Sequence, residues 1–253
     1  VLDLSWGIAG PMTGMILADH GAEVIKVEPP GGDPFRTQLG YKAWQRGKRS
    51  IVLDLKRAAD KDALLSLVRG ADVLIESFSP GTTTRLGIDY DSLQQINPRL
   101  VYGSITGYGR DNAHSDRPGY DSLVAARTGL QWELRGWPEG PVRHMNALPD
   151  LYPELDVPPG SAQGPERAGP LFSASNWPSL GAFFALALGI SAALRAREVT
   201  GRGQCVETSL LQGALCAGSD VWQRAENVDV AGFDSWVFGS KSDEEYKGVA
   251  AFF

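Results

Sequence analysis

The chain has 253 residues, of which 43% are hydrophobic and 21% are charged, a composition typical of a globular protein and too apolar for a disordered one. Its 24 basic and 30 acidic residues give a formal net charge of −6, so no general positive field exists to hold nucleic acid or an anionic membrane. Any anionic ligand must therefore be bound by individually placed groups.

Short β-rich apolar runs alternate with helical patterns along the chain. Strands are predicted at 1–4, 23–27, 51–54, 72–75, 100–105 and 205–208, and helices at 11–19, 59–69, 82–97 in two pieces, 121–133, 178–197 and 209–224. Such alternation is typical of a parallel sheet with helices on both faces. We therefore expect an α/β fold with a Rossmann-like sheet.

The helix predicted at 178–197 is rich in glycine and alanine, which leave little side-chain bulk and permit close approach of another backbone. We expect it to be the central buried helix. Its strongly apolar part, 180–194, is shorter than the roughly 20 residues that a membrane span needs, so no membrane span is expected.

The ends of the chain and one internal stretch bear on domain organisation. The chain opens on VLDLSW and closes on YKGVAAFF, both apolar, whereas free termini are usually polar, so we expect a fragment of a longer protein. A proline-rich stretch at about 136–178 has no sustained period and is predicted to be an irregular insertion. We expect one large domain at 1–224, followed at 225–253 by the start of a connection to a truncated small domain.

Cys205 and Cys216 stand without a cluster of further cysteines or histidines, so neither a disulfide framework nor a zinc site is indicated. No metal is expected. A reducing compartment fits this cysteine usage, and no secretory signal is recognisable, so we expect a cytoplasmic protein.

The first motif that could bind a ligand is the turn GIAGP, which starts at Gly7 between a predicted strand and a helix. Backbone N–H groups at a helix start favour phosphate, although a plain strand-to-helix turn has the same pattern. The turn is not GxGxxG, and Glu28, at the end of the second strand, is followed by PPGGDPFR. A nicotinamide-dependent oxidoreductase, the alternative from another class, is therefore disfavoured.

Three further segments offer groups for an anion or an aromatic ring. Arg36 follows a glycine pair, a charged flank containing Lys48 precedes the third strand, and Ser77 and Phe78 follow the fourth strand, with Arg85 beyond them. Ligands of open α/β sheets bind at the carboxyl ends of strands, and Arg suits phosphate. The alternatives are a solvated loop arginine, an ordinary charged flank and a core phenylalanine.

The order of these motifs is specific. The chain contains VLDLSWGIAGPMTGMILADHGAEVIKVEPPGGDPFR, RGKRSIVLDLK, ADVLIESFSPGTTTRLGIDYDSLQQINPRLVYGSITGYG, RPGYDSLVAARTGL and ALGISAALRAREVTGRGQCVETSLLQ. Together these blocks resemble the family III CoA-transferases, which include formyl-CoA transferase, carnitine CoA-transferase and α-methylacyl-CoA racemase. The resemblance covers nearly the whole chain except about 136–178.

The resemblance implies a binding site for coenzyme A or acyl-CoA, a carboxylic acid as second substrate, and an interlocked homodimer or a tandem-domain partner. Tyr120 and Asp121, in RPGYD, match residues near the active site. The family normally has Asn at the position of Ser77, and the exchange of Asn for Ser in this chain weakens one contact. The positions that match the family's CoA contacts are Gly7, Ile8, Ala9, Arg36, Leu53, Lys56, Ser77, Phe78 and Arg85.

The family's catalytic residue is an Asp whose carboxylate attacks the thioester and then carries CoA, and here its position is Ser179. A Ser hydroxyl without an adjacent base is a poor nucleophile and cannot form a carboxyl–CoA thioester. Asp150 or Asp156 could replace the missing acid if the proline-rich stretch folds back. The alternatives are thus an active CoA-transferase and a catalytically degenerate CoA-binding half of a longer CoA-transferase or acyl-CoA lyase.

Racemisation is disfavoured, because the histidine used by the racemase branch is Tyr120 here. We expect the three histidines of the chain, His20, His114 and His144, to be structural or solvated.

Overall fold

The structure, a computed structural model, describes residues 1–133 and 176–217. Residues 1–128 and 176–217 belong to one compact unit, and the rest of the chain is assigned to a second. The predicted connection at 225–253, most of the proline-rich stretch, and Asp150, Asp156 and His144 lie outside the described residues.

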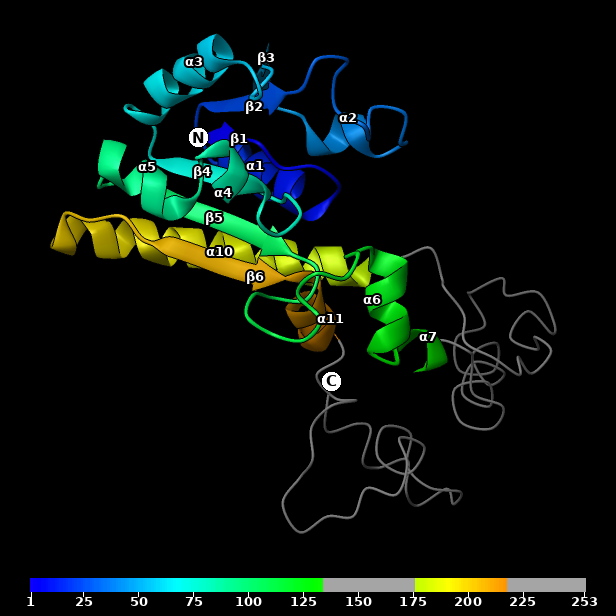
Figure 1. The fold of residues 1–253 in the computed structure, drawn as a ribbon. Helices are drawn as coiled ribbons and strands as arrows, with labels where there is room; N and C mark the ends of the chain where they lie inside the picture. The colour runs from blue at the N-terminus through cyan, green and yellow to red at the C-terminus, as the bar shows by residue number, and fades with distance from the viewer. Residues whose placement is uncertain (134–175, 218–253) are drawn as a thin grey trace, which may run out of the picture. The chain divides into compact units, whose positions relative to one another are not determined.

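Six parallel strands form one sheet in the order β3-β2-β1-β4-β5-β6 (Figure 1). The strands are β1 (Leu2–Asp3), β2 (Val24–Glu28), β3 (Lys48–Val52), β4 (Val73–Glu76), β5 (Val101–Thr106) and β6 (Cys205–Ser209). The order reverses at β1, because β2 and β3 extend from one of its sides and β4, β5 and β6 from the other. This is the doubly wound arrangement of Rossmann-like domains, so the predicted α/β class is confirmed.

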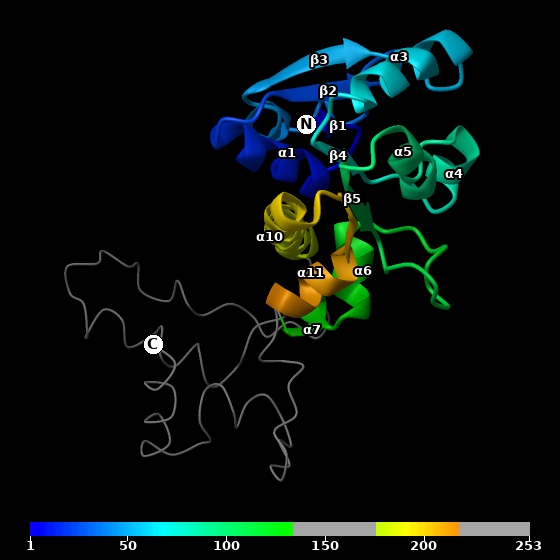
Figure 2. The same cartoon turned by 90° about the vertical axis from the view of Figure 1, so that its left-hand side faces the viewer.

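Helices connect the strands and cover both faces of the sheet. They are α1 (Ala9–Asp19), α2 (Tyr41–Trp44), α3 (Ala58–Val68), α4 (Thr82–Leu86), α5 (Tyr90–Ile96), α6 (Asp121–Arg127), α7 (Leu130–Glu133), α10 (Trp177–Thr200) and α11 (Leu210–Ala217). In Figure 2, α1 and α10 lie on one side of the strands, and α3 and α5 lie on the other. This two-faced cover is what the alternation of strand and helix patterns predicts.

The main apolar core lies between the sheet and the helices α3 and α5. Leu64 and Val68 of α3 and Leu93 of α5 are fully buried against Leu74 and Tyr102 of the sheet. Burying apolar surface stabilises a fold by about 25 cal/mol per Å², so this layer is a major contributor to stability.

Helix α10 packs one of its faces on the sheet. Leu186 and Ile190 are buried over Gly103 of β5. At its first turns α10 lies so close to α11 that a Cβ on Gly181 would overlap the backbone of Gly213. The expected close approach of another backbone is therefore confirmed.

The opposite face of α10 is exposed, so the expectation of a central buried helix holds for only one side of it. Trp177, Phe184 and Leu188 are exposed to 44%, 60% and 71%. By length and composition alone, α10 could cross a membrane, although a helix in the core of a globular domain passes the same test. Its contacts with the sheet, α1 and α11 are those of a core helix with one free face.

The structure differs from the sequence prediction at three elements. β3 runs through Lys48–Val52 and not through 51–54, because as an edge strand it pairs only with β2 and needs little apolar sequence. Helix α2 was not predicted. The helix predicted at 121–133 is divided at Gly129, whose φ of +82° ends α6.

Candidate functional site

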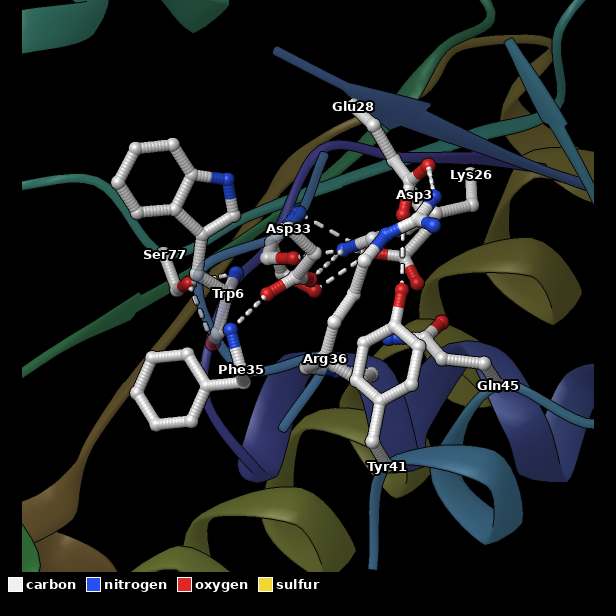
Figure 3. A network of polar contacts seen from close by, with 12 residues as sticks. Asp3, Trp6, Lys26, Glu28, Asp33, Phe35, Arg36, Tyr41, Gln45 and Ser77 are labelled. Atoms are coloured by element: carbon white, nitrogen blue, oxygen red, sulfur yellow. Dashed lines mark hydrogen bonds and ion pairs between the residues drawn. The ribbon is translucent and has the colours of Figure 1, made fainter. Parts of the chain in front are cut away.

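The turns that follow β1 and β4 meet where the strand order reverses. The backbone N–H of Trp6 donates to Ser77 Oγ at 2.7 Å, and Ser77 Oγ donates back to the Trp6 carbonyl at 3.0 Å (Figure 3). Phe78 contacts the Trp6 ring edge to face, with ring centroids 5.7 Å apart. Ligands of open α/β sheets bind at this reversal, outside the carboxyl ends of the strands.

The turn after β1 leads into a helix start that is open to an anion. Gly7 has a φ of +80°, which side-chain-bearing residues rarely adopt, and α1 begins at Ala9. Ile8, at the N-cap, makes no side-chain hydrogen bond, and the first turn of α1 contains no acidic residue. The first N–H groups of α1 therefore lack a side-chain acceptor and favour a negatively charged ligand.

A cluster of four buried charges, Asp3, Lys26, Asp33 and Lys48, lies beneath this turn. Lys48 Nζ is 2.7 Å from Asp3 Oδ2 and donates to the Pro11 carbonyl at 2.7 Å. Lys26 Nζ is 3.2 Å from Asp33 Oδ2 and 3.9 Å from Asp3 Oδ1. Two ammonium groups and two carboxylates balance one another, and Lys48 links α1 to strand β1.

The cluster shifts the pKa of two of its members. Burial alone would raise the pKa of Asp3, but the charges of Lys26 and Lys48 and hydrogen bonds from Lys48 and Ser5 hold it below its usual value. Burial lowers the pKa of Lys48, against the attraction of Asp3. The sequence left an ordinary charged flank open as the alternative for the segment around Lys48, and this alternative does not fit Lys48 itself, whose side chain is 2% exposed.

Arg36 is anchored beside this cluster by Glu28, the last residue of β2. The guanidinium forms an ion pair with Glu28 Oε2, and the Tyr41 hydroxyl donates to Glu28 Oε1 at 2.8 Å (Figure 3). Burial by itself would raise the pKa of Glu28, but these two hydrogen bonds and the Arg36 charge lower it. Glu28 is therefore a carboxylate at neutral pH.

Glu76, at the end of β4, holds the backbone of Phe78. Glu76 is buried, its Oε2 accepts the Phe78 N–H at 2.8 Å, and its Oε1 accepts from Ser104 Oγ at 2.5 Å. Burial raises the pKa of Glu76 in spite of these bonds. The position of Phe78 is thus set from within the sheet.

The predicted CoA contacts divide into two groups. Ser77 and Phe78 contact Trp6 at the reversal of strand order, Gly7 lies against Phe35, and Ile8 and Ala9 belong to the same turn. Arg36 follows Phe35, and its guanidinium is directed to Glu28 (Figure 3). Leu53, Lys56 and Arg85 are not hydrogen-bonded to this group. Leu53 is a buried core residue, and Lys56 and Arg85 are exposed, with Arg85 Nη2 donating to Thr82 Oγ1 at 2.9 Å.

Ser179 and Asp121 are brought together although 58 positions separate them in the chain. Asp121 Oδ1 accepts the Ser179 N–H at 2.8 Å, and Asp121 Oδ2 accepts from Ser179 Oγ at 2.7 Å. The expectation that the hydroxyl has no adjacent base is therefore wrong, because a carboxylate contacts it directly. Tyr120, at the N-cap of α6, is 63% exposed.

Sequence reasoning missed Trp6, Phe35 and Tyr41, as well as the buried partners Asp3 and Lys26. One signal was present: Asp3, Lys26 and Glu28 interrupt apolar runs that are predicted to be buried strands. Charges inside such strands are seldom left unpaired. No comparable signal marks Trp6, Phe35 or Tyr41.

Residues 1–155 match the sequence pattern of CoA-transferase family III. The chain is 38% identical over 224 residues to acetyl-CoA:oxalate CoA-transferase of Acetobacter aceti, covering 85% of this chain and 50% of that protein. A crystal structure of the Mycobacterium tuberculosis protein named probable fatty acyl-CoA transferase superposes with a TM-score of 0.70 at 33% identity, covering 87% of this chain and 54% of that one.

A crystal structure of a CaiB/BaiF family protein from Brucella suis is similar to the same extent, with a TM-score of 0.70, 30% identity and coverage of 87% and 55% of the two chains. The chain spans about half the length of these relatives.

Proposed function

Because this chain belongs to CoA-transferase family III, we propose that its protein moves coenzyme A between an acyl-CoA thioester and a carboxylic acid. The relatives' names differ in the acyl group, with acetyl, succinyl and fatty acyl among them, and share coenzyme A. The proposal therefore concerns CoA and leaves the acyl group open.

We propose that the described unit binds CoA at the carboxyl edge of its sheet. The observation that carries this proposal is that three separate segments meet at the reversal of strand order: Ser77 and Phe78 contact Trp6, and Phe35, which precedes Arg36, lies against Gly7. The open start of α1, Arg36, Lys56 and Arg85 supply positive groups for phosphates. Trp6 and Phe78 offer ring surfaces against which an adenine can pack.

The chemistry at Ser179 favours a second proposal, that this unit is the CoA-binding half of a longer enzyme. The family's covalent step needs a carboxylate that accepts an acyl group and then CoA, which a hydroxyl cannot do. Both oxygens of the neighbouring Asp121 already accept hydrogen bonds. The nucleophile would then come from another domain of the longer protein, because a second copy of this chain carries the same serine.

We also propose a cytoplasmic location, since both cysteines of the chain, Cys205 and Cys216, are free thiols.

Calorimetric titration with CoA tests the binding site. Arg85→Ala should weaken binding by about 1.5–3 kcal/mol, the contribution of one hydrogen bond to a charged group. Arg46→Ala is the control, because Arg46 is also exposed and pairs with Asp19 at the C-terminal end of α1, the end away from the turn at Gly7. Unchanged CoA affinity after both Arg36→Ala and Arg85→Ala would rule out the proposed site.

Mass spectrometry after incubation with an acyl-CoA tests the chemistry. The wild-type unit should carry no acyl or CoA adduct. In the full-length protein, we expect a gain of covalent CoA capture by Ser179→Asp rather than a loss of activity by Ser179→Ala. A wild-type adduct on Asp121, Asp150 or Asp156 would show that the nucleophile lies within this chain.

A further inference from the structure

Glu28 connects two side chains from different segments through one buried carboxylate. It is 2% exposed, and its two oxygens accept from Arg36 and from Tyr41 of α2 (Figure 3). The Arg36 side chain is 54% exposed. One end of the guanidinium is therefore fixed in the protein, while the remainder faces solvent at the carboxyl edge of the sheet.

The stem and backbone of Arg36 are fixed as well. Gly32 has a φ of +87°, and a Cβ at this position would lie 2.5 Å from Arg36 Nε, so the arginine side chain lies across the glycine. Asp33 Oδ1 accepts the Phe35 N–H at 2.8 Å, and Asp33 also pairs with the buried Lys26. The loop that carries Arg36 is thus tied to the buried charge cluster.

Tyr41 secures the oxygen of Glu28 that Arg36 does not use. Burial and the hydrogen bond to Glu28 raise the pKa of Tyr41, so its hydroxyl stays protonated and donates at neutral pH. Removal of that hydroxyl leaves Glu28 Oε1 without its donor, and the carboxylate is then free to turn away from Arg36.

We propose that Glu28 and Tyr41 are positioning residues that preset Arg36 to bind a phosphate group of the CoA ligand. The inference rests on the proposed CoA-binding function. An arginine held in its binding geometry loses less conformational entropy when the ligand arrives, and its planar donors match phosphate oxygens. CoA offers two sources of such oxygens, the 3′-phosphate and the diphosphate.

A carboxylate beside Arg36 can also act against phosphate binding, which would change the CoA affinity in the opposite direction. If the carboxylate only neutralises Arg36 and repels the phosphate, its removal strengthens binding. The sign of the change in CoA affinity after Glu28→Gln therefore decides between positioning and competition.

The test measures dissociation constants of the full-length protein for CoA, 3′-dephospho-CoA and pantetheine. Arg36→Lys identifies the phosphate that Arg36 contacts: loss for CoA alone indicates the 3′-phosphate, and loss for both phosphorylated ligands indicates the diphosphate. Tyr41→Phe should weaken binding of the same ligands about 2- to 10-fold, and Glu28→Gln about 10-fold, with pantetheine unaffected.

Two matched variants control for charge and for loss of a hydroxyl. Asp19→Asn removes one negative charge, as Glu28→Gln does, and unpairs Arg46, which is 51% exposed. Tyr90→Phe removes a half-buried tyrosine hydroxyl that lies 3.5 Å from the Gly203 carbonyl. Neither control should change the dissociation constant for CoA.

Tighter CoA binding by Glu28→Gln, or unchanged binding by both Glu28→Gln and Tyr41→Phe, overturns the positioning role while CoA binding itself stands. Equal weakening for all three ligands also overturns it, because a general structural defect does not depend on phosphate. A wild-type protein that binds neither CoA nor 3′-dephospho-CoA refutes the proposed function and the inference with it.

Discussion

Asp3 is the residue on which the arrangement beneath the proposed CoA site depends most. It lies between the ammonium groups of Lys26 and Lys48, and all three side chains are at most 3% exposed. Removing one partner of a buried ion pair leaves an uncompensated charge, which costs more than the pair contributes. Because Lys48 also bonds to the Pro11 carbonyl, loss of Asp3 affects the start of α1 and, through it, the turn at Gly7.

Asp3→Asn should therefore lower the free energy of unfolding by about 3–5 kcal/mol at pH 7. The pKa of Asp3 lies below its usual value of 3.8, so its stabilisation is present above about pH 4 and is lost as the pH falls through the folded-state pKa. The wild type should lose Tm more steeply below pH 4 than Asp3→Asn does.

Thermal melts by circular dichroism between pH 3 and pH 7 measure both effects. Asp116→Asn serves as the control, because Asp116 is an exposed loop residue. If Asp3→Asn melts at the wild-type temperature at pH 7, the buried ion pairs do not stabilise the fold.

At the scale of elements, the contact between α10 and α11 joins the two helices through glycines. Gly181 and Gly213 face each other so closely that neither position has room for a Cβ. The contact lies next to Ser179, whose N–H and hydroxyl are bound by Asp121 of α6. Three helices therefore fix the geometry around Ser179.

Gly181→Ala should destabilise the protein by about 1–3 kcal/mol, because the added methyl overlaps backbone atoms of Gly213 that cannot move independently. In an open helix the same change would stabilise by about 0.5–1 kcal/mol. Gly70→Ala is the control, since its Cβ meets nothing within 4 Å. Urea unfolding distinguishes the two signs, and stabilisation by Gly181→Ala would contradict the close contact.

Most elements could be predicted from the sequence, because the buried strands are largely apolar and the longest helix, α10, has clear end signals at Pro178 and Gly201. The residue range predicted for β3 was displaced from the observed one, because an edge strand exposes its residues and lacks an apolar pattern. Helix α2 was missed because its four residues are too few to show a period. The contacts of Ser77 and Glu28 arise only when distant segments meet, so spacing along the chain does not indicate them.

At the scale of the molecule, the exposed face of α10 is an apolar surface on an otherwise acidic protein. Trp177, Phe184 and Leu188 line this face, and exposed apolar patches commonly mark interaction surfaces. The proposed partner, a second copy or another domain, fits such a face. Residues 1–253 expressed alone should therefore be poorly soluble or form oligomers.

Replacement of Phe184 and Leu188 by Ser should reduce this association without lowering Tm, because both side chains are more than half exposed. Light scattering measures the oligomers, and a thermal melt confirms the fold. Val199→Ser, at the far end of α10 and 82% exposed, is the control. A wild-type chain that is already a well-behaved monomer with a sharp cooperative melt would contradict this interpretation.

The pairing of β5 with β6 has a consequence for how the protein folds during synthesis. Thr106 lies opposite Ser209, so this pair joins residues about a hundred positions apart, and such distant contacts form slowly. Until α10 and β6 leave the ribosome, the face of β5 around Gly103 has no cover. The growing chain thus exposes a sheet edge and an apolar face together, which makes the nascent protein a candidate client for chaperones.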